Sequence, residues 1–242
     1  ADRLSVATAQ SAGSTKSSAE LAALASQLRI PEQLVARGVG ARQLKVISYM
    51  APAMSIFFAF FLISYTARGF FEDKDQGMIE RMRAAPVRPY QILVGKSLSV
   101  LVFGLGSLLV ISLVTTKFFG AYWGDPLSVF LICAALVLAI VALTALVIGV
   151  ARTKRQAEGM SSALVFGLAL LGGNFVFLSA SPQVLQRIAL FTPNGWALRA
   201  FTKLSTTGGA LHTAVVPVLA ILGFALVIGA LAAVLARRSV TS

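Results

Sequence analysis

The sequence predicts an all-α polytopic membrane protein, on three observations. Only 12% of the 242 residues are charged and 57% are hydrophobic, whereas a soluble globular domain carries about 25% charged residues. The mean hydropathy is +0.83. The charged residues also gather between five long uncharged stretches, each long enough to cross a bilayer as a helix of roughly 20 residues. Helices suit these stretches because backbone polar groups in lipid must hydrogen-bond within their own segment.

The predicted elements follow one another along the chain in a simple alternation. Residues 1–45 are rich in Ser and Ala and contain no uncharged stretch of this length, which predicts an extracytoplasmic, partly helical segment. The five predicted transmembrane spans cover residues 46–68, 91–117, 126–151, 159–180 and 212–236. The segments between them are residues 69–90, 118–125, 152–158 and 181–211, and residues 237–242 form a tail.

The basic residues predict the orientation of these spans, because cytoplasmic connections carry an excess of Lys and Arg. Residues 68–96, residues 152–158 and the tail together hold eleven basic residues, whereas the alternate connections hold four. The first set, including the C-terminus, is therefore expected to be cytoplasmic. The six basic residues within 1–45 argue against this orientation, although a translocated domain is less bound by the rule than a short loop. An outside N-terminus without a signal sequence predicts one further span upstream, making six.

Composition also disfavours several classes of function. The net charge of +12 does not indicate nucleic-acid binding, because the basic residues lie at the ends of apolar stretches. Cys133 and His212 are the single cysteine and histidine, so the sequence predicts no metal site. The predicted spans contain no carboxylate, which disfavours a membrane-embedded enzyme, a channel and an ion-coupled carrier.

The connection 69–90 contains the densely charged, helix-prone stretch EDKDQGMIERMRAAP, residues 72–86. Met78 and Met82 fall on one helical face and the charged residues on others. The acidic residues at the start suit the positive end of a helix dipole, and Pro86 ends the stretch. The pattern predicts a short amphipathic helix along the cytoplasmic face. The alternative is a membrane-surface helix without a protein partner, against which the acidic half counts, because cytoplasmic lipid head groups are negative.

This stretch resembles the motif of ATP-binding cassette (ABC) exporters of the type-2 permease family. Those permeases carry a pattern close to E-x-E-x-G-T-x-E-x-L-x-x-x-P between their second and third spans, and then a Gly-Lys. Here Met78 stands where Thr is common and Met82 where Leu is common, but the spacing of Gly77, Glu80 and Pro86 is kept. Gly95-Lys96 follows, and the likeness covers roughly residues 46–238.

The resemblance implies an architecture of six spans, with an extracytoplasmic domain after the first. It also implies two short re-entrant helices near the outer face, before the last span. Residues 182–203 fit these helices, with a break at the sequence Thr192-Pro193-Asn194-Gly195-Trp196.

The resemblance further implies the permease subunit of an ATP-driven exporter in the bacterial plasma membrane. In such exporters the amphipathic helix docks into a separate ATPase subunit, which binds ATP and Mg²⁺, and the permease pairs with a second copy or a homologous permease. The chain has no G-x-x-x-x-G-K-[ST] loop, so no cofactor and no catalysis are expected in it. The residues expected to couple to the ATPase are Asp75, Gly77, Met78, Glu80, Met82, Arg83 and Pro86.

The candidate substrate pathway starts from the first predicted span, where aromatic side chains could stack on apolar ligands and hydroxyls could anchor them. Phe57, Phe61, Ser64 and Tyr65 are the candidates, with lipid contact and helix packing as the alternative for the phenylalanines. Asn174, the only Asn, Gln, Asp or Glu deep in a predicted span, is expected to make an interhelical hydrogen bond or to contact substrate. A hydrophobic drug or antibiotic is the expected substrate, and a lipid or polysaccharide the alternative.

Four further side chains carry expectations about the outer face. Trp123 and Trp196 are expected to anchor the protein at the membrane interface. Lys117 and Asp125 flank the connection 118–125, and a weak surface ion pair is expected between them.

Overall fold

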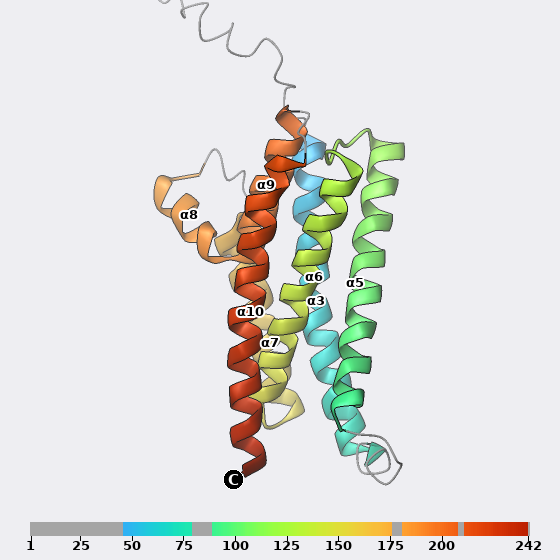
Figure 1. Cartoon of the computed structure of the whole chain (residues 1–242), viewed down its shortest axis with the longest axis vertical. Helices are drawn as coiled ribbons and strands as arrows, with labels where there is room; N and C mark the ends of the chain where they lie inside the picture. Colours follow the sequence, from blue (N-terminus) through green and yellow to red (C-terminus); the bar gives the residue numbers. More distant parts are fainter. Residues whose placement is uncertain (1–45, 79–88, 176–180, 208–210, 242) are drawn as a thin grey trace, which may run out of the picture. The chain divides into compact units, whose positions relative to one another are not determined.

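The computed structural model describes residues 46–78, 89–175, 181–207 and 211–241, and all regular secondary structure in these ranges is helical (Figure 1). The α-helices are α3 (Val46–Asp75), α5 (Pro89–Phe119), α6 (Pro126–Val150), α7 (Lys154–Gly172), α8 (Gln183–Ile188), α9 (Pro193–Thr207) and α10 (His212–Thr241). A short 3-10 helix, η2 (Ala189–Phe191), follows α8. Residues 1–45, with their predicted extracytoplasmic segment, lie outside the described residues.

Successive long helices run in opposite directions. At one end of the bundle, Lys154 at the start of α7 contacts Glu72 near the end of α3. At the other end, the backbone N–H of Tyr122, after α5, donates to Ser48 Oγ at the start of α3, at 3.0 Å. We call the first of these ends the charged end. Figure 1 shows that α10 also finishes there, as the alternation of basic connections predicts.

Four helices are long and apolar enough to span a membrane by length and composition. They are the whole of α3 and α6, residues Val94–Phe119 of α5 and residues His212–Leu235 of α10. The protein is therefore a polytopic α-helical membrane protein, as predicted, and four of the five predicted spans meet these criteria.

The fourth predicted span, residues 159–180, differs from the helix found there. Helix α7 starts earlier, at Lys154, and ends at Gly172, after 19 residues or about 28 Å. Gly173 ends it in the left-handed conformation (φ 83°), which glycine adopts without steric cost. The two short helices expected after it are present as α8 and α9, with a break at Thr192, which accepts a hydrogen bond from the N–H of Gly195.

The predicted helix over residues 69–90 also differs at its start. Residues 69–75 continue α3, so Glu72, Asp73 and Asp75 lie in the last turn of a long helix and not in the first turn of a new one. The chain then turns at Gly77, which has a φ of 69°. A hydrogen bond from its N–H to the carbonyl of Lys74 closes the turn at 3.1 Å. Residues 79–88 lie outside the described residues.

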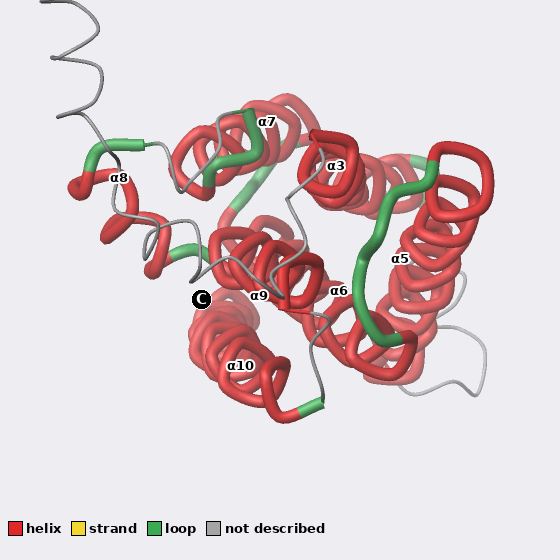
Figure 2. Tube along the Cα trace, turned by 90° about the horizontal axis from the view of Figure 1, so that it is seen from above, coloured by secondary structure: helices red, strands yellow, loops and turns green. Residues whose placement is uncertain are grey.

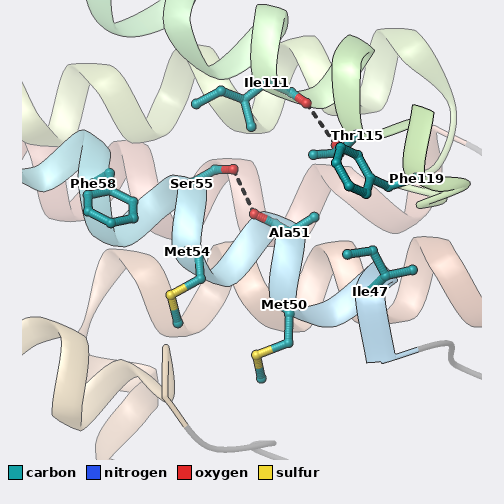
Figure 3. Close-up of a pocket in the computed structure, with 9 residues that line it drawn as sticks. All are labelled: Ile47, Met50, Ala51, Met54, Ser55, Phe58, Ile111, Thr115 and Phe119. Atoms are coloured by element: carbon teal, nitrogen blue, oxygen red, sulfur yellow. Dashed lines mark hydrogen bonds between the residues drawn. The ribbon is translucent and has the colours of Figure 1, made fainter. Parts of the chain in front are cut away.

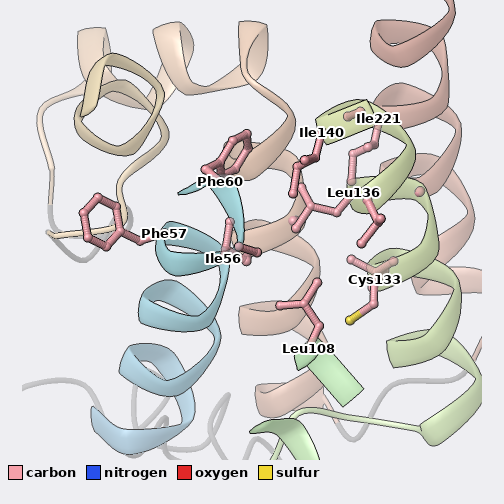
Figure 4. Packing of buried hydrophobic residues seen from close by; sticks show 14 of the residues in the cluster. Ile56, Phe57, Phe60, Leu108, Cys133, Leu136, Ile140 and Ile221 are labelled. Carbon is pink, nitrogen blue, oxygen red and sulfur yellow. The ribbon is translucent and has the colours of Figure 1, made fainter. Parts of the chain in front are cut away.

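Helices α6 and α9 lie at the centre of the bundle. Viewed from above, α9 sits among α3, α6, α7 and α10, while α5 lies to one side (Figure 2). The most apolar stretches of α3 and α6 are each 61% buried, against 17% for α5 and 11% for α10. Large apolar side chains from α3, α5, α6 and α10 meet in the core, as Figure 4 shows for Ile56, Phe60, Leu108, Leu136, Ile140 and Ile221.

Two expectations about the outer face were wrong. Trp123 is not an exposed anchor: it is 3% exposed, packs edge-on against Phe201 and donates from Nε1 to Thr115 Oγ1 at 2.9 Å. Asp125 forms no ion pair with Lys117, because its carboxylate instead caps α6 by accepting from the N–H of Ser128 at 3.1 Å.

Candidate coupling and transport surfaces

The predicted coupling residues begin where α3 ends. Asp75 is the last residue of α3, Gly77 makes the turn that follows, and Met78 is 43% exposed. Glu80, Met82, Arg83 and Pro86 lie outside the described residues, so their role stays a prediction. The described part places the start of the motif at the charged end of the bundle, directly after a long membrane helix.

Ion pairs join the end of α3 to two other helices. Glu72 Oε1 lies 2.6 Å from Lys154 Nζ of α7 and 3.0 Å from Arg68 Nε. Arg68 Nε in turn lies 3.7 Å from Glu158 of α7.

On the other side of α3, Asp73 Oδ2 lies 2.5 Å from Lys96 Nζ of α5. The same ammonium lies 5.7 Å above the ring of Phe70, within the range of a cation–π interaction. These contacts connect three helices at one end, and the sequence motif did not reveal them, because the pairs between helices join residues far apart in the chain.

The candidate pathway residues of α3 occupy different environments. Phe57 is 9% exposed and Phe61 is 38% exposed, whereas Tyr65 is 79% exposed. Ser64 is partly buried, and its Oγ has no hydrogen-bond partner among the described residues.

Two phenylalanines that sequence reasoning missed join Phe57 and Phe61. Phe166 of α7 lies 5.8 Å from Phe57 and 6.1 Å from Phe61 between ring centroids, and Phe175 lies 5.0 Å from Phe57. Phe58, which also lies in α3, contacts both Phe57 and Phe61. We call Phe57, Phe58, Phe61, Phe166 and Phe175 the aromatic patch; all but Phe57 are more than a third exposed.

Ser161 of α7 shares the property found at Ser64: its hydroxyl is buried and without a partner in the part of the chain that the structure describes. The contacts of Phe61 with Phe166 and of Arg68 with Glu158 bracket both serines in an antiparallel register. The two hydroxyls therefore lie at a similar level of the α3–α7 interface, between the aromatic patch and the charged end.

Asn174 makes interhelical hydrogen bonds, which confirms the first of its two expected roles. Its Nδ2 donates to the carbonyl of Ala53 in α3 at 2.7 Å, and its Oδ1 accepts from Asn194 Nδ2 of α9 at 2.6 Å. Asn194 also donates to the carbonyl of Leu168, and Tyr49 Oη donates to that of Gly173. Asn174 is fully buried, so contact with substrate stays a prediction that this arrangement does not support.

An apolar groove of about 320 Å³ lies between α3 and α5, near the end of the bundle opposite the charged end (Figure 3). Its polar side chains are committed to their own helices, since Ser55 donates to the carbonyl of Ala51 and Thr115 to that of Ile111. The groove therefore offers apolar contacts and no free hydroxyl proton. It is lined by Ile47, Met50, Ala51, Met54, Ser55, Phe58, Ile111, Thr115 and Phe119.

The fold and these surfaces define a multi-pass helical membrane protein. Ion pairs join α3 to α5 and α7 at the charged end, directly before the charged residues 76–86. The chain belongs to the ABC-2 transporter family, because residues 4–234 match the family described as "ABC-2 family transporter protein". This match confirms the resemblance to type-2 permeases, and the class is that of a transporter permease subunit.

A curated relative is the linearmycin resistance permease protein LnrN of Bacillus subtilis (strain 168). The two are 26% identical over 158 residues, which is 65% of this chain and 41% of the relative. The matched region thus spans less than half of the relative's length. No solved structure matches this chain.

Proposed function

We propose that this chain is the permease subunit of an ATP-driven exporter in the bacterial plasma membrane, with a cytoplasmic C-terminus. A separate ATPase subunit, which binds ATP and Mg²⁺, drives alternating access by moving residues 76–86. The observation that carries the proposal is that α3 is joined to α7 and to α5 by ion pairs immediately before this segment. A push on the segment therefore acts on three helices and not on one.

The substrate that we propose is a hydrophobic small molecule such as a drug or antibiotic. The aromatic patch supports this class, because aromatic rings offer large apolar contact surfaces, while Tyr65 adds an exposed hydroxyl close by in α3. The name of the relative, a linearmycin resistance permease, points the same way. A polysaccharide would demand many hydrogen-bonding groups, which the patch lacks, and a lipid is the remaining alternative. A second copy of the chain, or a homologous permease, would face the patch across the translocation pathway.

The coupling role can be tested by co-purifying the chain with its ATPase partner. Gly77→Pro and Glu80→Ala are expected to reduce ATPase recovery or ATPase rate about tenfold while the permease stays folded. Lys117→Ala serves as a matched charge removal, because Lys117 is exposed and lies at the opposite end of α5. Unchanged recovery and rate in both variants would leave the segment as a membrane-surface helix and contradict the proposal.

The substrate role has its own test in cells that depend on this transporter for resistance to a hydrophobic antibiotic. Phe61→Ala combined with Phe166→Ala is expected to lower resistance without lowering protein levels. Phe103→Ala is the control, because Phe103 is 72% exposed on α5 and does not belong to the aromatic patch. Equal loss in the control and the patch variant would show that the patch has no special role.

A further inference from the structure

At the charged end, Glu72, Asp73 and Lys154 carry charges of the same sign as the partial charge of the helix end on which each lies. Glu72 and Asp73 lie in the last turn of α3, where the partial charge of the helix is negative. Lys154 is the first residue of α7, where the partial charge is positive. Glu72 and Asp73 therefore weaken the end of α3, whose last turn also holds the favourably placed Lys74, and Lys154 weakens the start of α7. Glu72 has one partner within α3, Arg68, at 3.0 Å, and the partners in other helices lie at 2.6 Å for Glu72 with Lys154 and 2.5 Å for Asp73 with Lys96.

These ion pairs are also accessible to water. The side chains of Glu72 and Lys154 are 38% and 34% exposed, and those of Asp73 and Lys96 are 28% and 27% exposed. Solvated pairs contribute little net stability, because water competes for both charges. Such a contact can be broken and remade at small cost, whereas a buried pair would leave an uncompensated charge in a low dielectric.

The position of these pairs gives them a mechanical consequence. Asp75 ends α3 two residues after Asp73, and the chain turns at Gly77 into the segment that we assign to ATPase coupling. Movement of that segment therefore reaches Glu72 and Asp73 within one helical turn.

We propose that Glu72 and Asp73 form a clasp that holds α3 to α7 and α5, and that this clasp opens and closes in each transport cycle. This inference rests on the proposed function, since the ATPase supplies the movement. Glu72, Asp73, Lys96 and Lys154 are thus positioning residues, which set the relative placement of three helices without touching substrate. A purely static brace would hold the same contacts throughout the cycle.

Locking the clasp distinguishes these roles. The native chain has a single cysteine, Cys133, which is 1% exposed and can be replaced by serine to give a cysteine-free background. In that background, Glu72→Cys with Lys154→Cys is joined by a short, reducible bifunctional thiol reagent in the complex with the ATPase. Cross-linking is expected to lower the ATPase rate about tenfold, because the linker keeps the clasp closed and prevents it from opening. Reduction of the linker is expected to restore the rate.

The matched control places the same linker within one helix. Arg155 and Gly159 are both exposed and lie one turn apart on α7. Cross-linking Arg155→Cys with Gly159→Cys is expected to leave the rate unchanged. A charge exchange adds a second readout: Glu72→Lys alone is expected to lower the rate about threefold, and Glu72→Lys with Lys154→Glu to restore it.

Each outcome bears on the clasp. If the locked complex hydrolyses ATP as fast as the unlocked one, or if no cross-link forms, the clasp is wrong while the proposed function stands. If the parent chain does not retain the ATPase during purification, the proposed function and the clasp both fail. If the exchanged pair does not restore the rate, the effect of Glu72→Lys does not arise from its contact with Lys154.

Discussion

The side chain of Asn194 occupies the space that a β-carbon on Gly172 would need. A β-carbon there would lie 1.9 Å from Asn194 Nδ2. The orientation of this amide follows from its partners, because the carbonyl of Leu168 and Asn174 Oδ1 are both acceptors and require the Nδ2 donor. Glycine at 172 thus allows a polar side chain of α9 to reach the end of α7 inside an otherwise apolar core.

We predict that Gly172→Ala destabilises the protein by about 2 kcal/mol or more, because Asn194 must leave its partners or the helices must separate. Thermal unfolding of the purified permease in detergent would measure this as a lowered Tm. Gly167→Ala is the control, since Gly167 lies in the same helix and a β-carbon there would meet nothing within 4 Å. A control variant that loses as much stability would remove the role assigned to Asn194.

At the scale of elements, α6 shows how local chemistry positions a central helix. It begins with Pro126 at its first turn, directly after Asp125, whose carboxylate accepts hydrogen bonds from the backbone and side chain of Ser128. Proline is favoured in a first turn because its missing N–H would have no partner there. These signals determine where α6 starts. They also determine where the preceding loop ends, which contains the buried Trp123.

We predict that Asp125→Ala lowers stability by about 1 kcal/mol, the usual value of an N-cap, whereas Asp125→Asn retains most of it. Lys117→Ala is expected to have no measurable effect, because Asp125 acts as a cap and not as an ion-pair partner of Lys117. The same thermal unfolding assay separates the two explanations. Equal losses for Asp125→Ala and Lys117→Ala would favour the ion pair and count against the cap.

At the scale of the whole molecule, the two ends of the bundle differ in charge. Within the described residues, all four ion pairs lie at the charged end, which also carries Arg152 and Arg155. Only 17% and 11% of the most apolar stretches of α5 and α10 are buried, which suits contact with lipid or with another membrane helix. The positive-inside rule predicts that the charged end faces the cytoplasm.

We predict that this orientation can be read from cysteine labelling in intact cells. In the Cys133→Ser background, Lys117→Cys is expected to react with a membrane-impermeant maleimide, whereas Arg155→Cys is expected to react only after permeabilisation. Both native side chains are exposed, so the difference reports sidedness and not burial. The reverse pattern would place the C-terminus outside and overturn the cytoplasmic assignment of residues 76–86.

The candidate site was partly predictable from the sequence. Phe57 and Phe61 stand one turn apart on the same face of a predicted span, so their proximity was expected. Phe166 and Phe175 carry no such local signal, because their partners are about a hundred residues earlier in the chain. The same holds for Glu72 and Lys154, whose attraction depends on the antiparallel register of α3 and α7.

The class of fold, four of the five predicted spans and the end that carries the charges all follow from the amino-acid sequence alone. These features follow from transfer of local stretches between water and lipid, a property that each stretch possesses on its own. Only the packed structure shows that Glu72 meets Lys154, that Asn174 meets Ala53 and that Trp123 turns inward against Phe201. The contact energy of each pair exists only once the helices have packed, whereas the end of α7 at Gly172 follows from the left-handed conformation of Gly173.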